Sequence, residues 1–306
     1  MKLVKLLLLA ALVGAIAAGQ SSQRLAESGH CKEALPLLKA DLAKATAADK
    51  RKRLAVDGVR CGMTLHDMDA ALDFLRDLNK RFPNDPEVLY LSAHIFSELS
   101  INSSRKLMVS APSSHQVHEL NAEALETQGK WTEAEAEYRE VLKRDPQLPG
   151  IHYRIGRLLL SNPEAASRKS DARREFEEEL KIDPNNAGAE YVLGELARQD
   201  GQDAAAIGHF DRAAKLDAGF ADAFIGLGRA LLGAERAGDA IAPLETAVKL
   251  DPGSPMAHFQ LANAYERMGR KEDAAREFSL QKQAIEKLNQ TDQQVRQGIA
   301  GAPPQR

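Results

Sequence analysis

Apolar and polar residues repeat with a period of 34 residues between Ala187 and Ser254. Three matched sets mark the period: Leu193-Gly194 with Leu227-Gly228, Ala206 with Ala240, and Ala213 with Ala247. Self-similarity at a fixed period of about 20 to 50 residues is typical of stacked supersecondary units. The pattern therefore predicts a repeat architecture, in which each unit buries its apolar face against its neighbours.

Within one unit, the apolar residues form two runs with helical spacing. The first run is Tyr191, Leu193 and Ala197, and the second is Ala206, Phe210 and Ala213. The segment 199–201, Gln-Asp-Gly, separates them and contains the glycine that favours a turn. Each unit is therefore predicted to be a helix, a turn and a second helix.

Small residues indicate where the two helices cross. Gly194 lies inside the first predicted helix, where glycine costs roughly 1 kcal/mol relative to alanine. This cost is explained if the second helix crosses close to the backbone there. Ala206 supplies the matching small residue and Phe210 the large one beside it, because a close-packed crossing has no room for longer side chains.

The same frame extends to five units: 115–148, 149–186, 187–220, 221–254 and 255–288. The first of them has Gly129-Lys130-Trp131, Ala134, Tyr138 and Asp145-Pro146. This pattern resembles the tetratricopeptide repeat family. The resemblance implies an all-α fold, a right-handed solenoid of stacked antiparallel helix pairs. The unit 149–186 is four residues too long, and its excess falls in the turn between Ser161 and Ser170, where an insertion is tolerated best.

The chain before the five units, residues 20–114, is expected to hold degenerate helix pairs of the same kind. Ser22–Ala48 fits a pair with a short first helix, and Arg53–Pro83 fits a fuller pair. The segment Pro83–Pro112 is five residues short of the repeat. We favour a compressed pair, with helices at Val88–Leu99 and Ser103–Val109; a single bent helix is the alternative.

The two ends of the chain have different compositions from the repeats. Residues 1–19 carry Lys2 and Lys5, then an apolar run from Leu6 to Ala18 and small residues suited to cleavage. This predicts a secretory signal peptide, with an uncleaved anchor as the alternative. Residues 289–297 are polar and are expected to form a C-terminal cap helix. Residues 298–306, rich in Gly, Ala and Pro, are expected to be a disordered tail.

The composition excludes several classes of function. The formal net charge is −3, and it becomes −5 once Lys2 and Lys5 are removed, so nothing suggests nucleic-acid binding. His115 and His118 are interpreted as surface residues, because two histidines alone are a weak metal site. The acidic run Glu177–Glu179 is interpreted as a solvated helix face. No catalytic constellation, metal site or cofactor site is found, and we expect a protein that is not an enzyme.

Cys31 and Cys61 are the two cysteines of the chain. An exported protein with one pair of cysteines favours a disulfide, and both residues fall in the core-facing frame of neighbouring helices. Two buried free thiols are the alternative. Export with cleavage of the signal predicts a periplasmic or secreted protein that has no membrane span afterwards.

In the family, the first helices of successive repeats line a concave groove that holds extended peptides or partner helices. Transferring the frame places ten residues on this groove: Tyr153, Arg154, Arg157, Tyr191, Glu195, Arg198, Arg229, Phe259, Asn263 and Arg267. Aromatic rings offer rigid contact area and Arg binds carboxylates, so an acidic protein or peptide segment is the expected ligand. The competing interpretation is that these are ordinary exposed helix residues.

Three hypotheses about function follow. The first is an exported scaffold that mediates protein–protein interaction through the groove. The second is an assembly factor or subunit of a larger envelope complex, which would bind through the convex face or the N-terminal half. The third, an enzyme of unfamiliar type, lacks the clustered acid and base residues that it would need.

Overall fold

The computed structural model describes residues 21–162 and 169–300, and these form fifteen helices and no strand. The expected all-α architecture of antiparallel helix pairs is confirmed. The chain divides into two compact units, Met1–Pro112 (unit 1) and Ser113–Arg306 (unit 2). The predicted signal peptide lies outside the described residues, as does the central part of the predicted insertion after Ser161.

Unit 1 contains two helix pairs and a single long helix. Its elements are α2 (Ser22–Glu27), α3 (Cys31–Lys44), α4 (Ala48–Thr64), α5 (Met68–Arg81) and α6 (Pro86–Ser110). The preferred compressed pair is wrong, because α6 continues without a break for 25 residues. Asp85 caps its first turn by accepting hydrogen bonds from the backbone of Glu87 and Val88, and no Gly or Pro follows Pro86 to end the helix before Ser110.

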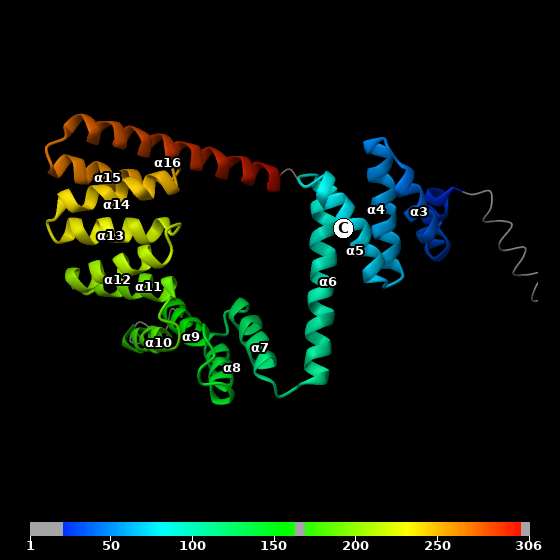
Figure 1. Ribbon diagram of the computed structural model, residues 1–306, viewed down its shortest axis with the longest axis horizontal. Helices are drawn as coiled ribbons and strands as arrows, with labels where there is room; N and C mark the ends of the chain where they lie inside the picture. Colours follow the sequence, from blue (N-terminus) through cyan, green and yellow to red (C-terminus); the bar gives the residue numbers. More distant parts are fainter. Residues whose placement is uncertain (1–20, 163–168, 301–306) are drawn as a thin grey trace, which may run out of the picture. The chain divides into compact units, whose positions relative to one another are not determined.

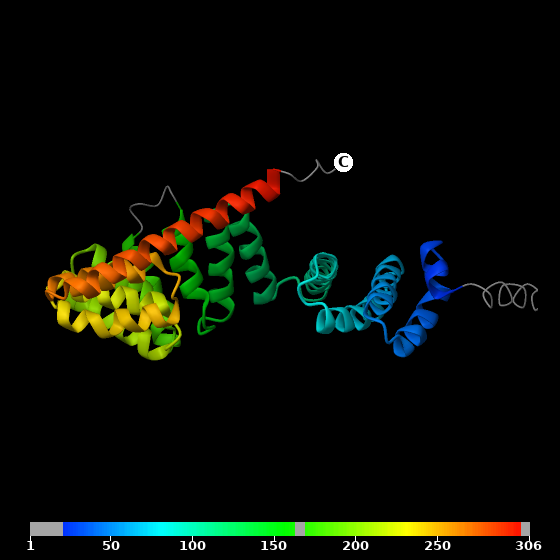
Figure 2. The same cartoon turned by 90° about the horizontal axis from the view of Figure 1, so that it is seen from above.

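Unit 2 contains five helix pairs, stacked side by side in Figures 1 and 2. Their bounds are α7 (His115–Thr127), α8 (Trp131–Arg144), α9 (Ile151–Ser161), α10 (Lys169–Ile182), α11 (Ala187–Gln199), α12 (Asp203–Leu216), α13 (Ala221–Gly233), α14 (Ala237–Leu250), α15 (Pro255–Arg267) and α16 (Lys271–Ala300). The first four pairs each fall within one of the predicted units, and the fifth begins with the unit 255–288 but continues past its end to Ala300.

The end of the chain differs from the expectation. A separate cap helix at 289–297 is wrong, because α16 is one helix of 30 residues that includes this segment. The expected disordered tail from residue 298 is wrong for its first three residues, which are also helical. The physical reason is that no Gly or Pro interrupts the chain between Lys271 and Gly298. Residues 301–306 lie outside the described part of the chain.

The close crossing predicted from glycine is present in unit 2. A Cβ atom added to Gly194 would lie 2.8 Å from the ring of Phe210, too close for any side chain. One added to Gly226 of the next repeat would lie 2.5 Å from the same ring. Phe210 is fully buried between them. Equivalent contacts join Gly156 to Phe176 and Gly228 to Leu244.

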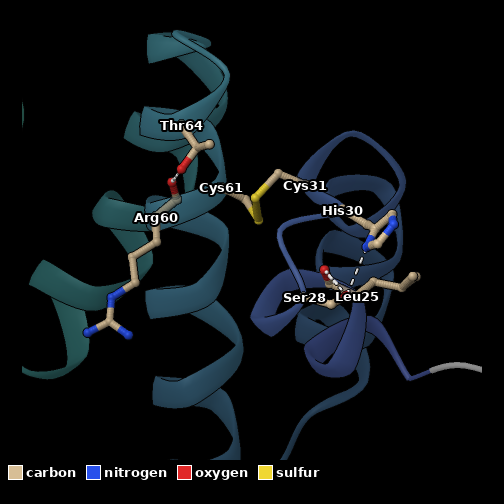
Figure 3. Close-up of a disulfide and its surroundings, with 7 residues drawn as sticks. All are labelled: Leu25, Ser28, His30, Cys31, Arg60, Cys61 and Thr64. Carbon is tan, nitrogen blue, oxygen red and sulfur yellow. Dashed lines mark hydrogen bonds between the residues drawn. A yellow bond between two sulfur atoms is a disulfide. The ribbon is translucent and has the colours of Figure 1, made fainter.

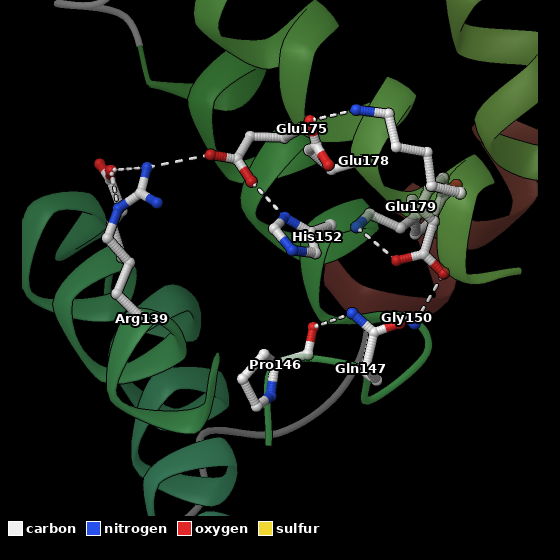
Figure 4. A network of polar contacts seen from close by, with 11 residues as sticks. Arg139, Pro146, Gln147, Gly150, His152, Glu175, Glu178 and Glu179 are labelled. Atoms are coloured by element: carbon white, nitrogen blue, oxygen red, sulfur yellow. Dashed lines mark hydrogen bonds and ion pairs between the residues drawn. The ribbon is translucent and has the colours of Figure 1, made fainter. Parts of the chain in front are cut away.

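One carboxylate inside unit 2 holds the start of a helix. Glu179 is fully buried, and it accepts hydrogen bonds from the backbone N–H of Gly150 at 2.7 Å and of Tyr153 at 3.1 Å (Figure 4). It therefore satisfies the free N–H groups at the start of α9 and places a negative charge at the positive end of the helix dipole. The interpretation of Glu177–Glu179 as a solvated face is wrong for Glu179, although Glu177 and Glu178 are exposed.

Histidine–carboxylate contacts join the first helix to the second in four of the five pairs. The distances are 2.6 Å for His118–Glu137, 2.7 Å for His152–Glu175, 2.6 Å for His209–Glu190 and 2.7 Å for His258–Glu277. Three of these contacts span 19 residues of sequence, and the fourth spans 23 because it crosses the four-residue insertion. In α11 and α12 the order is reversed, and the first helix carries the carboxylate. His118 is therefore a partly buried structural residue, and its interpretation as a simple surface histidine is wrong.

The contact between His152 and Glu175 also affects the pKa of Glu175. Burial alone would raise the pKa of Glu175, but the hydrogen bond with His152 and the charge of Arg139 outweigh it and hold this pKa below its usual value (Figure 4). A carboxylate with a lowered pKa stabilises the fold above the pKa of the unfolded chain, and this contribution is lost as the pH falls through the folded pKa. The pair therefore favours the ionised carboxylate in the folded repeat.

Exchanging the two partners of a pair should be tolerated, because α11 and α12 already use the reversed order. We predict that His118→Glu or Glu137→His alone lowers the free energy of unfolding by roughly 1–2 kcal/mol, since the remaining group loses its partner. The double exchange should recover most of this loss. Urea unfolding followed by circular dichroism measures it, with Glu133→His on the exposed side of α8 as a control. A double variant no more stable than the sum of the single losses would contradict a specific pair.

Cys31 and Cys61 link α3 to α4 within unit 1. Cys31 is the first residue of α3, and Cys61 lies in the last turn of α4 (Figure 3). The disulfide joins Cα atoms 4.9 Å apart, and both residues are buried. It closes a loop with a sequence separation of 30 residues that lies wholly inside unit 1.

We predict that this bond is present in the protein isolated from its native host and stabilises unit 1 alone. Thiol titration of denatured, unreduced protein should find no free cysteine. Reduction should lower the free energy of unfolding of unit 1 by about 3–4 kcal/mol, because the unfolded chain regains the freedom that a loop of this size removes. Hydrogen exchange should show the loss in α2 to α5 and none in α11 to α16. Two free thiols per chain would support the alternative of buried free cysteines.

Candidate protein-binding surface

The residues predicted to bind a partner lie on four first helices of unit 2. Tyr153, Arg154 and Arg157 belong to α9, and Tyr191, Glu195 and Arg198 belong to α11. Arg229 lies on α13, and α15 carries Phe259, Asn263 and Arg267. The surface that these helices present through the ten residues is called the first-helix face below.

Contacts between successive repeats bring these side chains together. Arg154 of α9 reaches Glu123 of α7 at 2.8 Å. Arg229 of α13 lies 3.6 Å from Glu195 of α11. Further along, Arg267 of α15 donates a hydrogen bond of 2.6 Å to the carbonyl oxygen of Leu232 in α13. Because each contact joins one first helix to the preceding one, the first helices lie next to one another along unit 2.

The two tyrosines of the face are partly structural. Tyr153 packs edge-on against Phe176 at a centroid distance of 5.6 Å. Tyr191 lies between Phe210 and Phe220, at 5.7 and 5.0 Å. Burial raises the pKa of Tyr191, and the charge of Glu195 adds to the effect. Each ring therefore offers only part of its surface to a ligand.

Most of the arginines on the face have carboxylate partners within unit 2. Arg198 pairs with Glu195 at 2.9 Å, and Arg229 contacts the same carboxylate. The hydrogen bond to Glu195 raises the pKa of the Arg198 guanidinium. Arg154 lies between Glu123 and Glu119, which is 3.7 Å away. The face is consequently less positive than its arginines alone indicate.

Arg157 differs from these arginines. It is exposed, and it forms no ion pair with any residue in the described parts of the chain. Its guanidinium carbon lies 6.0 Å from the centre of the Tyr153 ring, at the outer limit of a cation–π contact. Leu160, one turn further along the same side of α9, keeps 41% of its surface exposed. Arg157 therefore combines an available positive charge with apolar and aromatic neighbours.

The C-terminal end of the face is more apolar. Phe259 is 38% exposed, and its ring lies 6.2 Å from that of Phe278. Met256, one turn earlier on α15, is also exposed. Arg267 lines a surface hollow of about 480 Å³ together with Met268 and residues 235–239. Asn263 lies between these two features on the same helix and is half-buried.

Glu119, Glu123 and Leu160 also lie on the first-helix face, although they were not among the ten residues predicted for it. Glu119 and Glu123 precede Tyr153 and Arg157 by one repeat of 34 residues, so the same frame places them on the first-helix face. Leu160 occupies in α9 the place that Arg198 has in α11, once the repeat length is taken into account. The repeat period could therefore have identified Glu119, Glu123 and Leu160 as residues of the first-helix face.

Unit 1 has its own concentration of charge on its first helices. A hollow of about 370 Å³ is lined by α2, α4 and the start of α6. Its charged lining includes Glu27, Asp49, Lys52, Arg53, Asp57 and Arg60. Burial raises the pKa of Asp57, and a hydrogen bond from Gln23 opposes this shift. Charges of both signs line the hollow, so it matches a polar ligand rather than one of a single sign.

The described residues contain no group of three or more His, Cys, Asp or Glu side chains placed to hold a metal ion. Within the same residues, none of the helices has both the length and the apolar composition needed to cross a membrane.

Comparisons with known proteins agree with this architecture. The family model for the tetratricopeptide repeat matches residues 119–167, 164–219 and 225–281, just over half of the chain. A search of curated proteins finds no significant match.

Solved structures with the same fold include MamA, which is 24% identical, with a TM-score of 0.50, over 57% of this chain and 94% of its own. The segment of MamA from residue 41 to its end, from Desulfovibrio magneticus RS-1, is 22% identical with a TM-score of 0.50 over 56% of this chain and 96% of its own. YrrB, a tetratricopeptide repeat protein with an unusual peptide-binding site, is 19% identical with a TM-score of 0.50 over 59% of this chain and 91% of its own.

Proposed function

The chain belongs to the tetratricopeptide repeat family, and from this we propose that it is an exported scaffold that binds a segment of another protein along the first-helix face. The observation that carries the proposal is the exposed Arg157, set beside Tyr153 and Leu160. The other arginines of the face have partners within unit 2, which are carboxylates for Arg154, Arg198 and Arg229 and a backbone carbonyl for Arg267. Solubility alone does not require an exposed arginine without an ion-pair partner next to exposed apolar and aromatic side chains.

The chemistry of the face favours a long ligand of mixed character. Arg157 offers bidentate hydrogen bonds to a carboxylate, and the neighbouring Leu160 and Tyr153 offer apolar contact. Met256 and Phe259 offer a second apolar area three repeats further along the array. An extended or helical segment that carries an acidic residue between apolar residues fits this arrangement. YrrB, which shares the fold, has a peptide-binding site of its own.

The paired arginines have a different role in this proposal. Arg154, Arg198 and Arg229 join one first helix to the next or to a residue on the same helix, so they keep the face rigid. A rigid face loses little conformational entropy when it binds. Specificity for acidic residues then rests on Arg157 rather than on all the arginines together.

We predict that Arg157→Glu abolishes capture of the partner and leaves helicity and melting temperature unchanged, because Arg157 has no ion pair with the described residues to lose. Tagged protein produced in its native host is purified, and the co-purifying proteins are quantified by mass spectrometry. Arg174→Glu, on the exposed side of α10 in the same repeat, is the matched control and should retain the partner. Capture by the natural protein should weaken with salt, because exposed charges are screened within about 10 Å at 0.1 M.

The alternative, binding through unit 1 as part of a larger envelope complex, is favoured by the charged hollow there. Arg53→Glu changes this hollow at an exposed position of α4. If Arg157→Glu captures the same partners as the natural chain and Arg53→Glu loses them, the first-helix face is not the binding site and unit 1 is. The scaffold proposal assigns no reaction to the chain.

Export is the second part of the proposal, supported by the composition of residues 1–19 and by the buried cysteine pair of unit 1. We predict that the protein recovered outside the cytoplasm begins at Ala18 or Gln20, the residues that follow the two suitable cleavage sites. N-terminal sequencing measures this. Replacing Leu8 and Leu9 with Arg should block export, because the apolar run is then interrupted. An exported protein that still begins at Met1 would support the uncleaved anchor instead.

A further inference from the structure

Helix α6 has a wide exposed face without a single charged residue. Four residues of α6 carry charge, namely Glu87, Glu98, Arg105 and Lys106. At about 100° per residue, all four lie away from the side that holds most of the exposed apolar residues, and Val109, near the end of the helix, is the exception. That side, called the α6 face below, consists of Leu89, Tyr90, Ala93, Phe96, Ser97, Ser100, Ile101, Ser104, Leu107 and Met108.

The α6 face is the opposite side of the helix from the one that packs into unit 1. Val88, Leu91 and Ile95 are buried against the rest of unit 1. The C-terminal part of α6 extends past the ends of α4 and α5 in Figure 1. A helix that is apolar on both sides is normally covered on both sides.

The exposed apolar area is larger than most monomers present and supplies more than half of one side of a stable interface. Leu89, Tyr90, Phe96, Ile101 and Met108 keep between 43% and 64% of their surface exposed. Large side chains present on the order of 200 Å² each, so these five at about half exposure offer roughly 500 Å², and the serines and alanine between them add to it. A monomer seldom exposes an apolar patch beyond a few hundred Å², whereas a stable interface buries about 800 Å² on each partner.

The residues of the α6 face are arranged in a way that suits a second copy of the same helix. A central line of small residues, Ala93, Ser97, Ser100 and Ser104, allows close approach of another helix. Larger residues form an edge on each side of this line: Leu89, Phe96 and Leu107 on one side, and Tyr90, Ile101 and Met108 on the other. The spacing of the small residues, four, three and four, keeps them on one side of the helix over three turns.

A two-fold axis between residues 98 and 99 matches this pattern to itself. In an antiparallel pair related by such an axis, each edge meets the same edge of the other helix. To within about one residue, Leu89 then lies level with Leu107 of the second copy, and Tyr90 lies level with Met108 of the second copy. On the central line, Ala93 lies level with Ser104, and Ser97 with Ser100. Large residues therefore meet large ones and small residues meet small ones.

We propose that the protein forms a homodimer in which two copies of α6 pack antiparallel through the α6 face. A different partner protein would not require the face to match itself about a central axis, whereas a second copy does. The α6 face belongs to unit 1 and shares no residue with the first-helix face of unit 2. The proposal does not depend on the function assigned to that face.

Cysteine pairs test the direction and register of the two helices on the full chain. An equimolar mixture of Ala93→Cys and Ser104→Cys protein should form a disulfide-linked dimer on brief oxidation, because the two positions face each other in the antiparallel pair. Ala93→Cys alone should not, because its two copies would lie about 16 Å apart along the helix axis, at a rise of about 1.5 Å per residue. That separation is beyond the reach of a disulfide. Crosslinking of Ala93→Cys alone as efficient as that of the mixture would overturn the antiparallel arrangement.

Light scattering during size-exclusion chromatography tests the dimer itself. The natural protein should have twice the mass of one chain at micromolar concentration. Ser100→Arg should have the mass of one chain with unchanged helicity, because it places a charge on the central line of the face. Ser279→Arg, at an exposed serine of α16, is the control and should remain a dimer. A natural protein that stays monomeric at about 100 µM, as it would if unit 2 covered the α6 face, overturns the proposal.

Discussion

The contact between a glycine backbone and a large side chain is the constraint on which unit 2 depends. Phe210 fills the space that a Cβ would occupy at Gly194 in its own repeat and at Gly226 in the next. One side chain therefore sets the distance between α11 and α12 and also the distance to α13. Because each repeat completes the core of its neighbour, neither the helix pair nor the first-helix face exists without the array.

The helix pairs of unit 2 could be predicted from the sequence, because the glycine contact recurs in several of them. Gly194, Ala206 and Phe210 have counterparts at the same spacing in Gly228, Ala240 and Leu244, so the helix pairs and the divisions between repeats followed from the period. The continuous helix α6 did not, because a segment shorter than the repeat was assumed to keep its turn although no Gly or Pro supports one. The same error separated residues 289–297 from α16. In both places the absence of a helix-breaking residue was a better guide than the repeat length.

The ten residues assigned to the first-helix face show a second limit of sequence reasoning. Their positions could be derived because each repeat presents the same side of its first helix. Their charges could not be judged one residue at a time, because Glu195 lies close to Arg229 from the following repeat. The positive charge of an arginine in one repeat is balanced by a carboxylate of the neighbouring repeat. Among the described residues, Arg154, Arg198 and Arg229 are neutralised by carboxylates, Arg267 is held by a backbone carbonyl, and Arg157 alone has neither kind of partner.

The reversed histidine–carboxylate pair of α11 and α12 bears on how such an array can grow. If α11 were joined to the second helix of another paired repeat, Glu190 would face a second carboxylate such as Glu137, with no proton donor between them. If α7 were joined to α12, His118 would face His209. A duplication or exchange that involves α11 or α12 therefore keeps this contact only when it carries both helices, with its breakpoints in the loops on either side of the pair. In this repeat the contact makes the helix pair, rather than the single helix, the segment that recombination can move.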